Sequence, residues 1–503
     1  MSSRRIIAFD AGGTALKAAI YDERGEELAV AGATMMPLRP APGCLERDPQ
    51  AMWSAICKVS REVLAAAAVA PSSIVAVGLT GYGNALYLLD RNGKPVRNGI
   101  LSPDLRAEAI VARWRASGLE DEAIPLTYQR LWPGKPAPLI AWLEAHEPEA
   151  LARAERAMFC KDYLRFRLTG AYGLEISELS SGGLIDQGAR RFAPAVLEGF
   201  GLGRYARLYG EGVEPLTIFG AVTAEAAAET GLAAGTPVST GYADGPAMAL
   251  GLGAIDESLI SVIAGTWGLN QLASRTPVAD GSISAMIVGP RPGEYVLNDA
   301  APTSASAFEW FVDSVVSAAD GGRRDHAALF AFCNEQAAQV GDSKSAPYFL
   351  PYLNGRIDQP KARGCFIGLA SWHGLPEMIR AIFEGVAFEH RRHIDRLLEG
   401  RARPRAARFA GGAARSKPWL DIFAAAIDLP LELAAASELG ALGAAIVAAV
   451  GVGLYPDLES AVAAMTRVRD RVEPDPTLVD ALARRRAIYG ELCDALAQTW
   501  TNL

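Results

Sequence analysis

Two stretches of the chain decide its fold: residues 5–22 (RIIAFDAGGTALKAAIYD) and residues 259–273 (LISVIAGTWGLNQLA). Each begins with an apolar strand, breaks at a glycine turn and resumes as a second strand-compatible run. Both stretches therefore predict a β-hairpin with glycines and a hydroxyl at its tip. One hairpin opens the chain and the other lies near its middle, which suggests two related halves.

Strands mixed with helices follow the first hairpin. Residues 49–68 have apolar side chains at helical spacing, and residues 74–79 form an apolar strand. This mixture predicts an α/β fold. A helix-like run ends in glycines at residues 251–256, just before the second hairpin. We therefore expect one domain of residues 1–252 and another of residues 253–503.

The composition excludes several classes of protein. The chain has 503 residues, half of them hydrophobic, which is enough for two domains with buried cores. Its net charge of −8 argues against nucleic acid or an anionic membrane as a partner. The six cysteines show no regular spacing, the N-terminus lacks a secretory signal and no stretch resembles a membrane span. These features predict a cytoplasmic protein with reduced thiols.

The first hairpin carries residues suited to holding phosphates. Gly12 and Gly13 allow the backbone to approach a phosphate closely, and Thr14 offers a hydrogen bond. Asp10 is a candidate for holding Mg²⁺ through water, and Lys17 supplies positive charge. A plain turn is the alternative interpretation of this segment.

The second hairpin tip, Gly265 and Thr266, again places a hydroxyl beside glycine. The segment at residues 408–416 reads as a strand, a glycine loop and the start of a helix. Its glycines, Gly411 and Gly412, would let a nucleoside lie against bare backbone, although a tight connection explains them equally well. The hairpin tip at Gly265 and Thr266, taken together with the first hairpin tip, favours a site that binds phosphate from two sides.

Asp244 lies between an apolar strand at residues 237–240 and a helix expected at residues 247–252, which places it at the N-terminus of that helix. An ordinary helix cap is one interpretation of this aspartate. Its place just before the domain boundary favours a second one, a carboxylate that takes a proton from an attacking hydroxyl. The spacing of His390 and His393 places both on one helix face, which we interpret as a surface helix rather than a metal site.

With these motifs together, the chain resembles the FGGY family of carbohydrate kinases over nearly its full length. The most specific match is the family's C-terminal signature, GCFIGL at residues 364–369 followed by EMIRAIFE at residues 377–384. The resemblance implies two ribonuclease-H-like domains of the actin, Hsp70 and hexokinase type, which close on ATP and Mg²⁺ at a catalytic cleft between them. It also implies that the N-terminal domain binds the sugar and the C-terminal domain binds ATP.

The resemblance further implies roles for particular residues. Asp244 matches the catalytic base and Asp10 the metal-associated carboxylate. The residues implied on the ATP side are Gly12, Gly13, Thr14, Lys17, Gly265, Thr266, Gly411, Gly412 and Ser416. The residues implied on the sugar side are Gly83, Asn84, Asp104, Arg106 and Thr303.

Within the family, the stretches at residues 98–104 and 161–165 are most similar to kinases of L-xylulose or 3-keto-L-gulonate. D-xylulose, ribulose, erythritol and glycerol remain alternative substrates, and a homodimer is the expected assembly. A sugar sensor without catalysis is a different class of function. The presence of both Asp10 and Asp244 speaks against such a sensor.

Overall fold

The computed structural model describes residues 4–340 and 346–502. Its backbone divides into two compact units. Unit 1 comprises Met1–Ile255, Ala273–Leu297 and Ala436–Arg467, and unit 2 comprises Asp256–Leu272, Asn298–Ala435 and Val468–Leu503. Each unit combines strands with helices, which confirms the predicted α/β class.

Unit 1 is built on a sheet of six strands in the order β13-β14-β5-β1-β2-β3. Strand β1 (Arg5–Ala11) pairs antiparallel with β2 (Ala15–Asp22), so the first predicted hairpin is confirmed. On its other side β1 pairs in parallel with β5 (Ile74–Gly81). The parallel pair brings the ends of β1 and β5 to the same edge of the sheet, which is where Asp10 lies.

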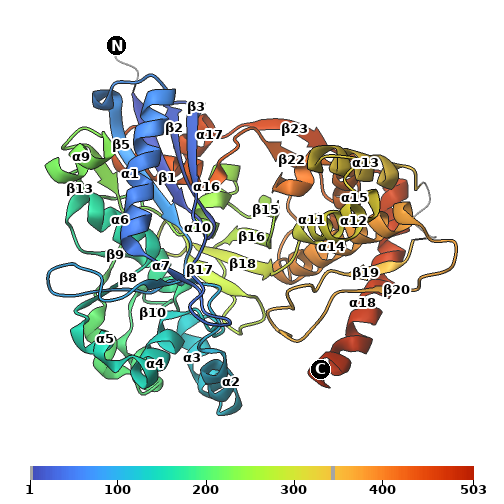
Figure 1. The fold of residues 1–503 in the computed structure, drawn as a ribbon, viewed down its shortest axis with the longest axis horizontal. Coiled ribbons are helices and arrows are strands. Elements are labelled where there is room, and N and C mark those ends of the chain that lie inside the picture. The colour runs from blue at the N-terminus through green and yellow to red at the C-terminus, as the bar shows by residue number, and fades with distance from the viewer. Residues whose placement is uncertain (1–3, 341–345, 503) are drawn as a thin grey trace. The chain divides into compact units, whose positions relative to one another are not determined.

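Alternate residues of β1 serve two different cores. Ile7 and Phe9 belong to the core that includes residues of α1 (Pro49–Ala66), which runs along the sheet in Figure 1. Ile6 and Ala8 belong to the core formed with α16 (Leu439–Gly451). Successive side chains of a strand point to opposite faces, so the sheet is buried by a helix on each side.

Close packing of two helices fixes the place of α10 (Asp244–Leu252), which begins at the candidate base. A Cβ added to Gly443 of α16 would lie 1.8 Å from the carbonyl oxygen of Ala247. The alanines of α16 are buried, as the alanine-rich sequence predicts for a tightly packed helix. The backbones of α10 and α16 are therefore in direct contact where the two helices cross.

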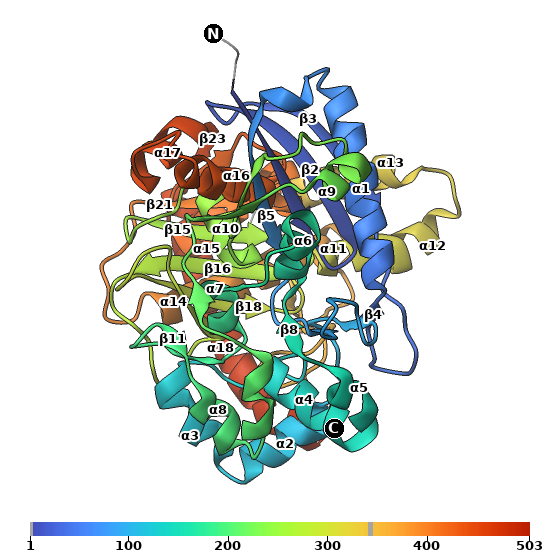
Figure 2. The same ribbon diagram turned by 90° about the vertical axis from the view of Figure 1, so that its left-hand side faces the viewer.

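Several short helices of unit 1 gather at one end of it, below the six-stranded sheet in Figure 2. Among them, α2 contacts α3 and α4, while α4 contacts α5. The helices of unit 1 not yet given bounds are α2 (Glu108–Ala116), α3 (Leu119–Thr127), α4 (Pro136–His146), α5 (Pro148–Arg153), α6 (Cys160–Thr169), α7 (Ile176–Ser181), α8 (Pro194–Gly199), α9 (Ala224–Thr230) and α17 (Leu458–Met465).

The other strands of unit 1 complete the six-stranded sheet or form two-stranded ladders, except β17, which pairs with β18 in the seven-stranded sheet. They are β3 (Glu27–Thr34), β4 (Glu46–Arg47), β6 (Tyr87–Leu89), β7 (Gly99–Ile100), β8 (Arg156–Met158), β9 (Leu174–Glu175), β10 (Ile185–Asp186), β11 (Arg191–Phe192), β12 (Gly212–Val213), β13 (Ile218–Ala221), β14 (Pro237–Ser239) and β17 (Ala285–Val288).

Unit 2 repeats the arrangement of the first hairpin. Strand β15 (Leu259–Ala264) pairs antiparallel with β16 (Gly268–Ser274) and in parallel with β21 (Ala406–Ala410). The second predicted hairpin is therefore confirmed. The strand order continues from β21 to β22 (Leu431–Ala434) and β23 (Val468–Val472).

Helices of unit 2 pack together through α14, which contacts α13, α15 and the C-terminal α18. The elements of unit 2 not yet given bounds are α11 (Ser306–Phe311), α12 (Ser317–Asp320), α13 (His326–Ala338), α14 (Leu375–Leu397), α15 (Lys417–Ile427), α18 (Pro476–Asn502), β18 (Tyr295–Ala301), β19 (Tyr348–Leu350) and β20 (Cys365–Ile367). Strand β18 begins in unit 1 and ends in unit 2.

The first prediction concerns the crossing of α10 and α16. Gly443→Ala should lower the free energy of unfolding by about 2 kcal/mol, because the added methyl group forces two backbones apart. Gly210→Ala is the control, since a Cβ at Gly210 meets nothing within 4 Å. Urea denaturation of the two variants measures the difference, and equal stabilities would contradict the close packing.

Candidate functional site

The predicted site residues fall into two groups, one in each unit. Unit 1 holds Asp10, Gly12, Gly13, Thr14, Lys17, Gly83, Asn84, Asp104, Arg106 and Asp244. Unit 2 holds Gly265, Thr266, Thr303, Gly411, Gly412 and Ser416.

Asp10 lies near the end of β1, opposite Lys17 on β2 and Thr80 on β5. The first turn of α16 approaches it directly, because a Cβ on Gly440 would lie 2.2 Å from its Oδ2 atom. Loss of water around the carboxyl group and, after it, the neighbouring carboxylates of Asp244 and Glu438 together raise its pKa to about 7. Negative charge therefore gathers at this edge of the sheet.

The ammonium group of Lys17 is the nearby positive charge, and it lowers the pKa of Asp10. Its Nζ atom donates a hydrogen bond of 2.9 Å to Glu438, the residue that precedes α16. The hydroxyl of Tyr21 donates to the backbone oxygen of the same glutamate. Lys17 and Tyr21 thus hold the start of α16 against the first hairpin.

Buried Arg47 fixes the tip of this hairpin, a role that the sequence analysis missed. Its guanidinium donates to the backbone oxygens of Gly12 and Gly13, at 3.3 and 2.5 Å. In a planar trans peptide the N–H group points opposite to the C=O group. The N–H groups of Gly13 and Thr14 are therefore turned away from Arg47, as a phosphate-binding turn requires.

Asp244 is the first residue of α10 and is intermediate in burial as a whole residue. It is not the N-cap: that position belongs to Ala243, which makes no side-chain capping bond. The Asp244 carboxylate accepts the N–H of Gly245 at 2.7 Å. Loss of water around the carboxyl group raises its pKa and backbone hydrogen bonds from Gly245 and Gly83 oppose the rise, which leaves the pKa at about 6.

The segment before Asp244 is held by side chains from three other elements. Arg165 of α6 donates to the backbone oxygen of Thr240 at 2.8 Å. Thr80 of β5 donates to the backbone oxygen of Tyr242, and Ser177 of α7 accepts the N–H of Ala243. The backbone that carries the carboxylate is thereby fixed.

A buried cluster of charges lies behind this segment. Lys161 contacts carboxylate oxygens of Asp162 at 3.2 Å, Glu175 at 3.3 Å and Glu178 at 3.9 Å. Arg165 pairs with Asp162 at 3.0 Å. All of these side chains are fully buried, and burial raises the pKa of Glu178 well above its ordinary value.

The other residues expected on the sugar side of unit 1 differ in how many contacts they make within the protein. Asn84 has a φ of 60°, and its Oδ1 atom accepts the hydroxyl of Ser181 at 3.3 Å. Asp104 is fully buried, and its carboxylate binds Arg106 and the N–H of Leu45. The Arg106 guanidinium also lies over the ring of Trp142. Asp104 and Arg106 therefore hold each other and the backbone around them.

In unit 2, two loops contact the second hairpin tip. The backbone oxygens of Gly265 and Thr266 accept the N–H groups of Ala305 at 2.8 Å and Ser304 at 3.2 Å. Gly411 has a φ of 102°, and a Cβ on it would lie 2.3 Å from the oxygen of Ala264. Only glycine fits this backbone and this contact.

The remaining predicted residues of unit 2 make polar contacts. Ser416 caps α15 by accepting the N–H of Trp419, and it donates to Asn334 at 2.6 Å. The hydroxyl of Thr303 accepts the N–H of Asn354 at 3.1 Å. Asn334 was missed because it lies far from the glycine loop in sequence, inside an ordinary helix.

The interpretation of His390 and His393 as part of a surface helix is wrong, because both are buried in α14. His390 lies between Asn270 and Ser304, each at 2.8 Å from one of its ring nitrogens. Burial lowers its pKa to about 3, so the ring is neutral at pH 7. Its chain of hydrogen bonds supports the loop that binds the second hairpin tip.

Two absences concern the residues that the structure describes. None of the helices within these ranges has the length and the apolar character that a membrane crossing requires. Within the same ranges, no three His, Cys, Asp or Glu side chains converge as a set of metal ligands. All six cysteines are free thiols.

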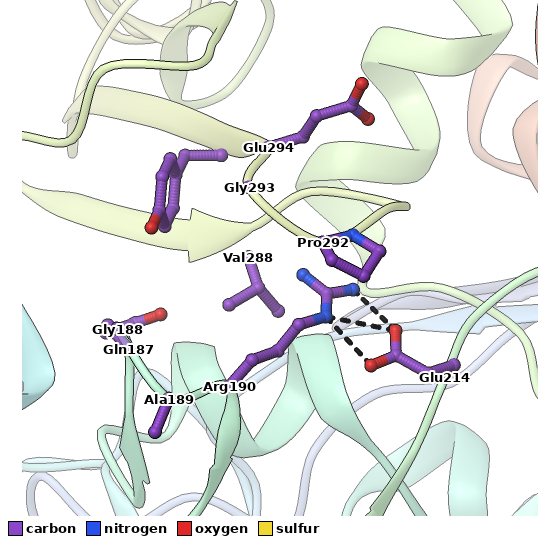
Figure 3. A pocket seen from close by; sticks show the side chains of 10 residues that line it. Gln187, Gly188, Ala189, Arg190, Glu214, Val288, Pro292, Gly293 and Glu294 are labelled. Atoms are coloured by element: carbon purple, nitrogen blue, oxygen red, sulfur yellow. Dashed lines mark hydrogen bonds and ion pairs between the residues drawn. The ribbon is translucent and has the colours of Figure 1, made fainter.

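A cavity of about 360 Å³ lies elsewhere in unit 1, and Figure 3 shows the residues that line it. It contains none of the predicted site residues. Arg190 reaches into it but is already bound to Glu214 and to the backbone oxygen of Gly289. Its guanidinium is therefore engaged by the protein itself.

Comparisons with known proteins agree with this geometry. Residues 5–251 match the N-terminal domain of the FGGY family of carbohydrate kinases, and residues 260–452 match its C-terminal domain. The chain belongs to this family. It is therefore a carbohydrate kinase, a phosphotransferase that uses ATP and an alcohol acceptor, as the sequence predicted.

The chain is similar to several named proteins over nearly its whole length. It is 34% identical to the L-xylulose/3-keto-L-gulonate kinase of Escherichia coli K12, covering 97% of both chains. It is 31% identical to a probable L-xylulose kinase of Pasteurella multocida, over 97% of this chain and 98% of the relative. A solved xylulose kinase from Rhodospirillum rubrum superposes with a TM-score of 0.87 and 27% identity, over 99% of this chain and 100% of the other.

The second prediction concerns the buried imidazole. An unfolded chain binds a proton at His390 near its ordinary pKa of 6.5, whereas the folded chain does so only at about 3. Stability should therefore fall as the pH drops below 6.5, by about 1.4 kcal/mol per pH unit for this group alone.

Urea denaturation between pH 6 and 4 measures this loss. His390→Gln should show a correspondingly shallower fall than the wild type. His146→Gln is the control, because His146 is exposed. Equal slopes for the wild type and His390→Gln would refute a neutral, buried imidazole.

Proposed function

We propose that the chain transfers the γ-phosphoryl group of ATP to a hydroxyl of a small ketose, with L-xylulose or 3-keto-L-gulonate as first candidates. The observation that carries the proposal is the carboxyl group of Asp244 at the start of α10, held on a fixed backbone beside Gly83. The activity named for the 34% identical relative supports the choice of sugar.

In the proposed mechanism Asp244 is the general base. Its carboxylate accepts the proton of the sugar hydroxyl as the hydroxyl oxygen bonds to the γ-phosphorus. The bond between that phosphorus and the bridging oxygen of ATP breaks, and ADP leaves. The hydrogen bond from Gly245 holds Asp244 in place for this proton transfer.

The oxygen ligands around Asp10 suit Mg²⁺, which prefers carboxylate and water oxygens. Asp10, Asp244 and Glu438 bring more negative charge together than Lys17 balances, as the raised pKa of Asp10 indicates. We propose that Asp10 holds the ion, directly or through water. When bound, Mg²⁺ would neutralise charge on the phosphates of ATP.

For ATP we propose contacts with both hairpin tips. Gly12, Gly13, Thr14 and Lys17 would serve one end of the phosphate chain, and Gly265 with Thr266 the other. The nucleoside would lie against Gly411, Gly412 and Ser416. In this assignment residues 1–252 form the sugar-binding domain with the base, and residues 253–503 form the ATP-binding domain.

The sugar contacts in this proposal come from Gly83, Asn84 and Thr303. Asp104 and Arg106 contribute to the sugar side through the backbone that they hold. We further propose a cytoplasmic enzyme that forms a homodimer and has neither nucleic acid nor a membrane as a partner. Its net charge of −8 supports the last point.

The third prediction tests the reaction with a coupled assay of ADP formation at fixed Mg²⁺. L-xylulose and 3-keto-L-gulonate should be turned over faster than D-xylulose, the ribuloses, erythritol and glycerol. Asp244→Asn should lose about 10²- to 10⁴-fold in kcat, because it cannot accept the hydroxyl proton.

The control for this assay is Asp480→Asn, at an exposed aspartate of α18. Turnover of another member of the panel would replace the substrate but keep the mechanism. Sugar binding without turnover of any member would instead favour a sensor, and full activity of Asp244→Asn would refute the assignment of the base.

The fourth prediction concerns pH. A base with a pKa of about 6 is active only as the carboxylate, so kcat/KM for the sugar should fall as the pH drops below 6. The decrease should approach tenfold per pH unit. A profile that stays flat from pH 7 to pH 5 would exclude Asp244 as the base.

A further inference from the structure

The cavity in Figure 3 is formed entirely by unit 1 and lies apart from the predicted site residues. Its walls are residues 187–190, Glu214, and the turn between β17 and β18, which contributes Val288 and residues 292–295. Sites for small molecules commonly have volumes of about 300 to 1,000 Å³. The cavity, at about 360 Å³, falls within this range and can hold a small molecule.

The walls of the cavity are fixed by hydrogen bonds within the protein. The side chain of Gln187 donates to the backbone oxygens of Thr127 and Met286, each at 3.0 Å. Ser180 of α7 accepts the N–H of Val288, also at 3.0 Å. The cavity is therefore already formed without a ligand. Binding in such a site requires little ordering of the protein, which favours affinity.

Arg190 brings to this cavity a donor that the protein does not use. Its Nε and Nη2 atoms bind the carboxylate of Glu214, and Nη2 also donates to the backbone oxygen of Gly289. Nη1 makes no hydrogen bond to the described residues and is the nitrogen without a dashed line in Figure 3. The Arg190 side chain is only 10% exposed. Two N–H groups of a largely buried guanidinium thus remain for a ligand.

The backbone of Arg190 is a second, independent observation. Its φ of 53° lies in the left-handed region, which residues other than glycine, asparagine and aspartate seldom adopt. Such conformations cost free energy and concentrate at ligand-binding and active sites. Here the strained residue is the one that supplies the unused donor. Both observations therefore indicate that this position serves a ligand.

The charges around the cavity are balanced within the protein. Arg190 pairs with Glu214, and Arg291 pairs with Glu294 at a shortest distance of 2.7 Å. Figure 3 shows the carboxylate of Glu294 directed away from Arg190. An anionic ligand would be repelled by Glu214, and a cationic one would compete with Arg190 for the same carboxylate. A neutral ligand avoids both costs.

Hydroxyl groups match the polar atoms of this wall. Nη1 of Arg190 requires an acceptor, whereas the Glu214 carboxylate has lone pairs left for a donor. A hydroxyl group both accepts and donates, so two neighbouring hydroxyls can bind the arginine and the glutamate together. Tyr295 also lines the cavity, and its hydroxyl makes no hydrogen bond to the described residues.

We propose that this cavity is a second binding site, which takes a small, neutral, polyhydroxylated molecule such as a pentitol or a free ketose. Nη1 of Arg190 donates to one hydroxyl oxygen of the ligand, and Glu214 accepts the hydrogen of a neighbouring hydroxyl. None of the residues assigned to phosphoryl transfer lines the cavity. The inference therefore goes beyond the proposed function and does not depend on it.

The fifth prediction uses isothermal titration calorimetry of the full chain with xylitol, a neutral pentitol, as the probe. The wild type should bind xylitol in the cavity. Arg190→Lys should weaken this binding at least about tenfold, because lysine keeps the charge but not the planar set of donors. Arg204→Lys is the matched control, since Arg204 pairs with Glu144 outside the cavity.

Glu214→Gln is a second variant for the case in which Arg190→Lys does not fold. It keeps an oxygen for Arg190 but replaces the carboxylate that accepts the ligand's hydrogen, so it should also weaken xylitol binding. Xylitol bound at the site of Asp244 as well would appear as a further equivalent, with the same affinity in these variants and the wild type. Inorganic phosphate should not displace xylitol from the cavity, because the cavity disfavours anions.

Three results would each overturn the proposal. They are no binding of xylitol to the wild type, the same number of sites and affinity in the wild type and both cavity variants, and displacement of xylitol by phosphate. Failure of the proposed function has a different signature. If the chain phosphorylates no sugar but loses xylitol affinity in Arg190→Lys, the function fails and the second site stands.

Discussion

The buried charges of unit 1 are the constraint on which the candidate base depends. Lys161 and Arg165 are surrounded by Asp162, Glu175 and Glu178, and none of these side chains reaches water. Removing one partner from such a group leaves an uncompensated charge in a medium of low dielectric. The relative positions of α6, α7 and the segment before Asp244 are therefore determined together. Precise placement of the base follows from that requirement.

This cluster also explains why the base is held without a helix cap. A serine or aspartate at the N-cap would use its side chain on the helix itself. Here Ala243 occupies that position, and its N–H is satisfied by Ser177 instead. The hydrogen bond that fixes this turn therefore comes from Ser177 of α7. The Asp244 carboxylate accepts the N–H of Gly245 in the first turn of the same helix.

The sequence predicted both hairpins and a helix just after Asp244, because these depend on local patterns of apolar residues and glycine. The helix begins three residues earlier than expected, at Asp244 itself. The cluster of unit 1 could not be predicted in this way. Glu178 lies in a helix of six residues with no amphipathic pattern, and its neighbour Gly83 is far away in the chain. His390 was misread for a related reason: the spacing of two histidines defines a helix face, but burial depends on what packs against it.

The backbone of each hairpin tip is held in its orientation by a different kind of supporting group. In unit 1 the side chain of Arg47 binds the backbone oxygens of Gly12 and Gly13. In unit 2 the backbone N–H groups of Ser304 and Ala305 donate to the backbone oxygens of Thr266 and Gly265. Because a trans peptide directs its N–H opposite to its C=O, both arrangements turn amide hydrogens of the tip away from the supporting loop. A glycine turn acquires its orientation from whatever binds its carbonyl groups, so the supporting residues are as much a part of each tip as the glycines themselves.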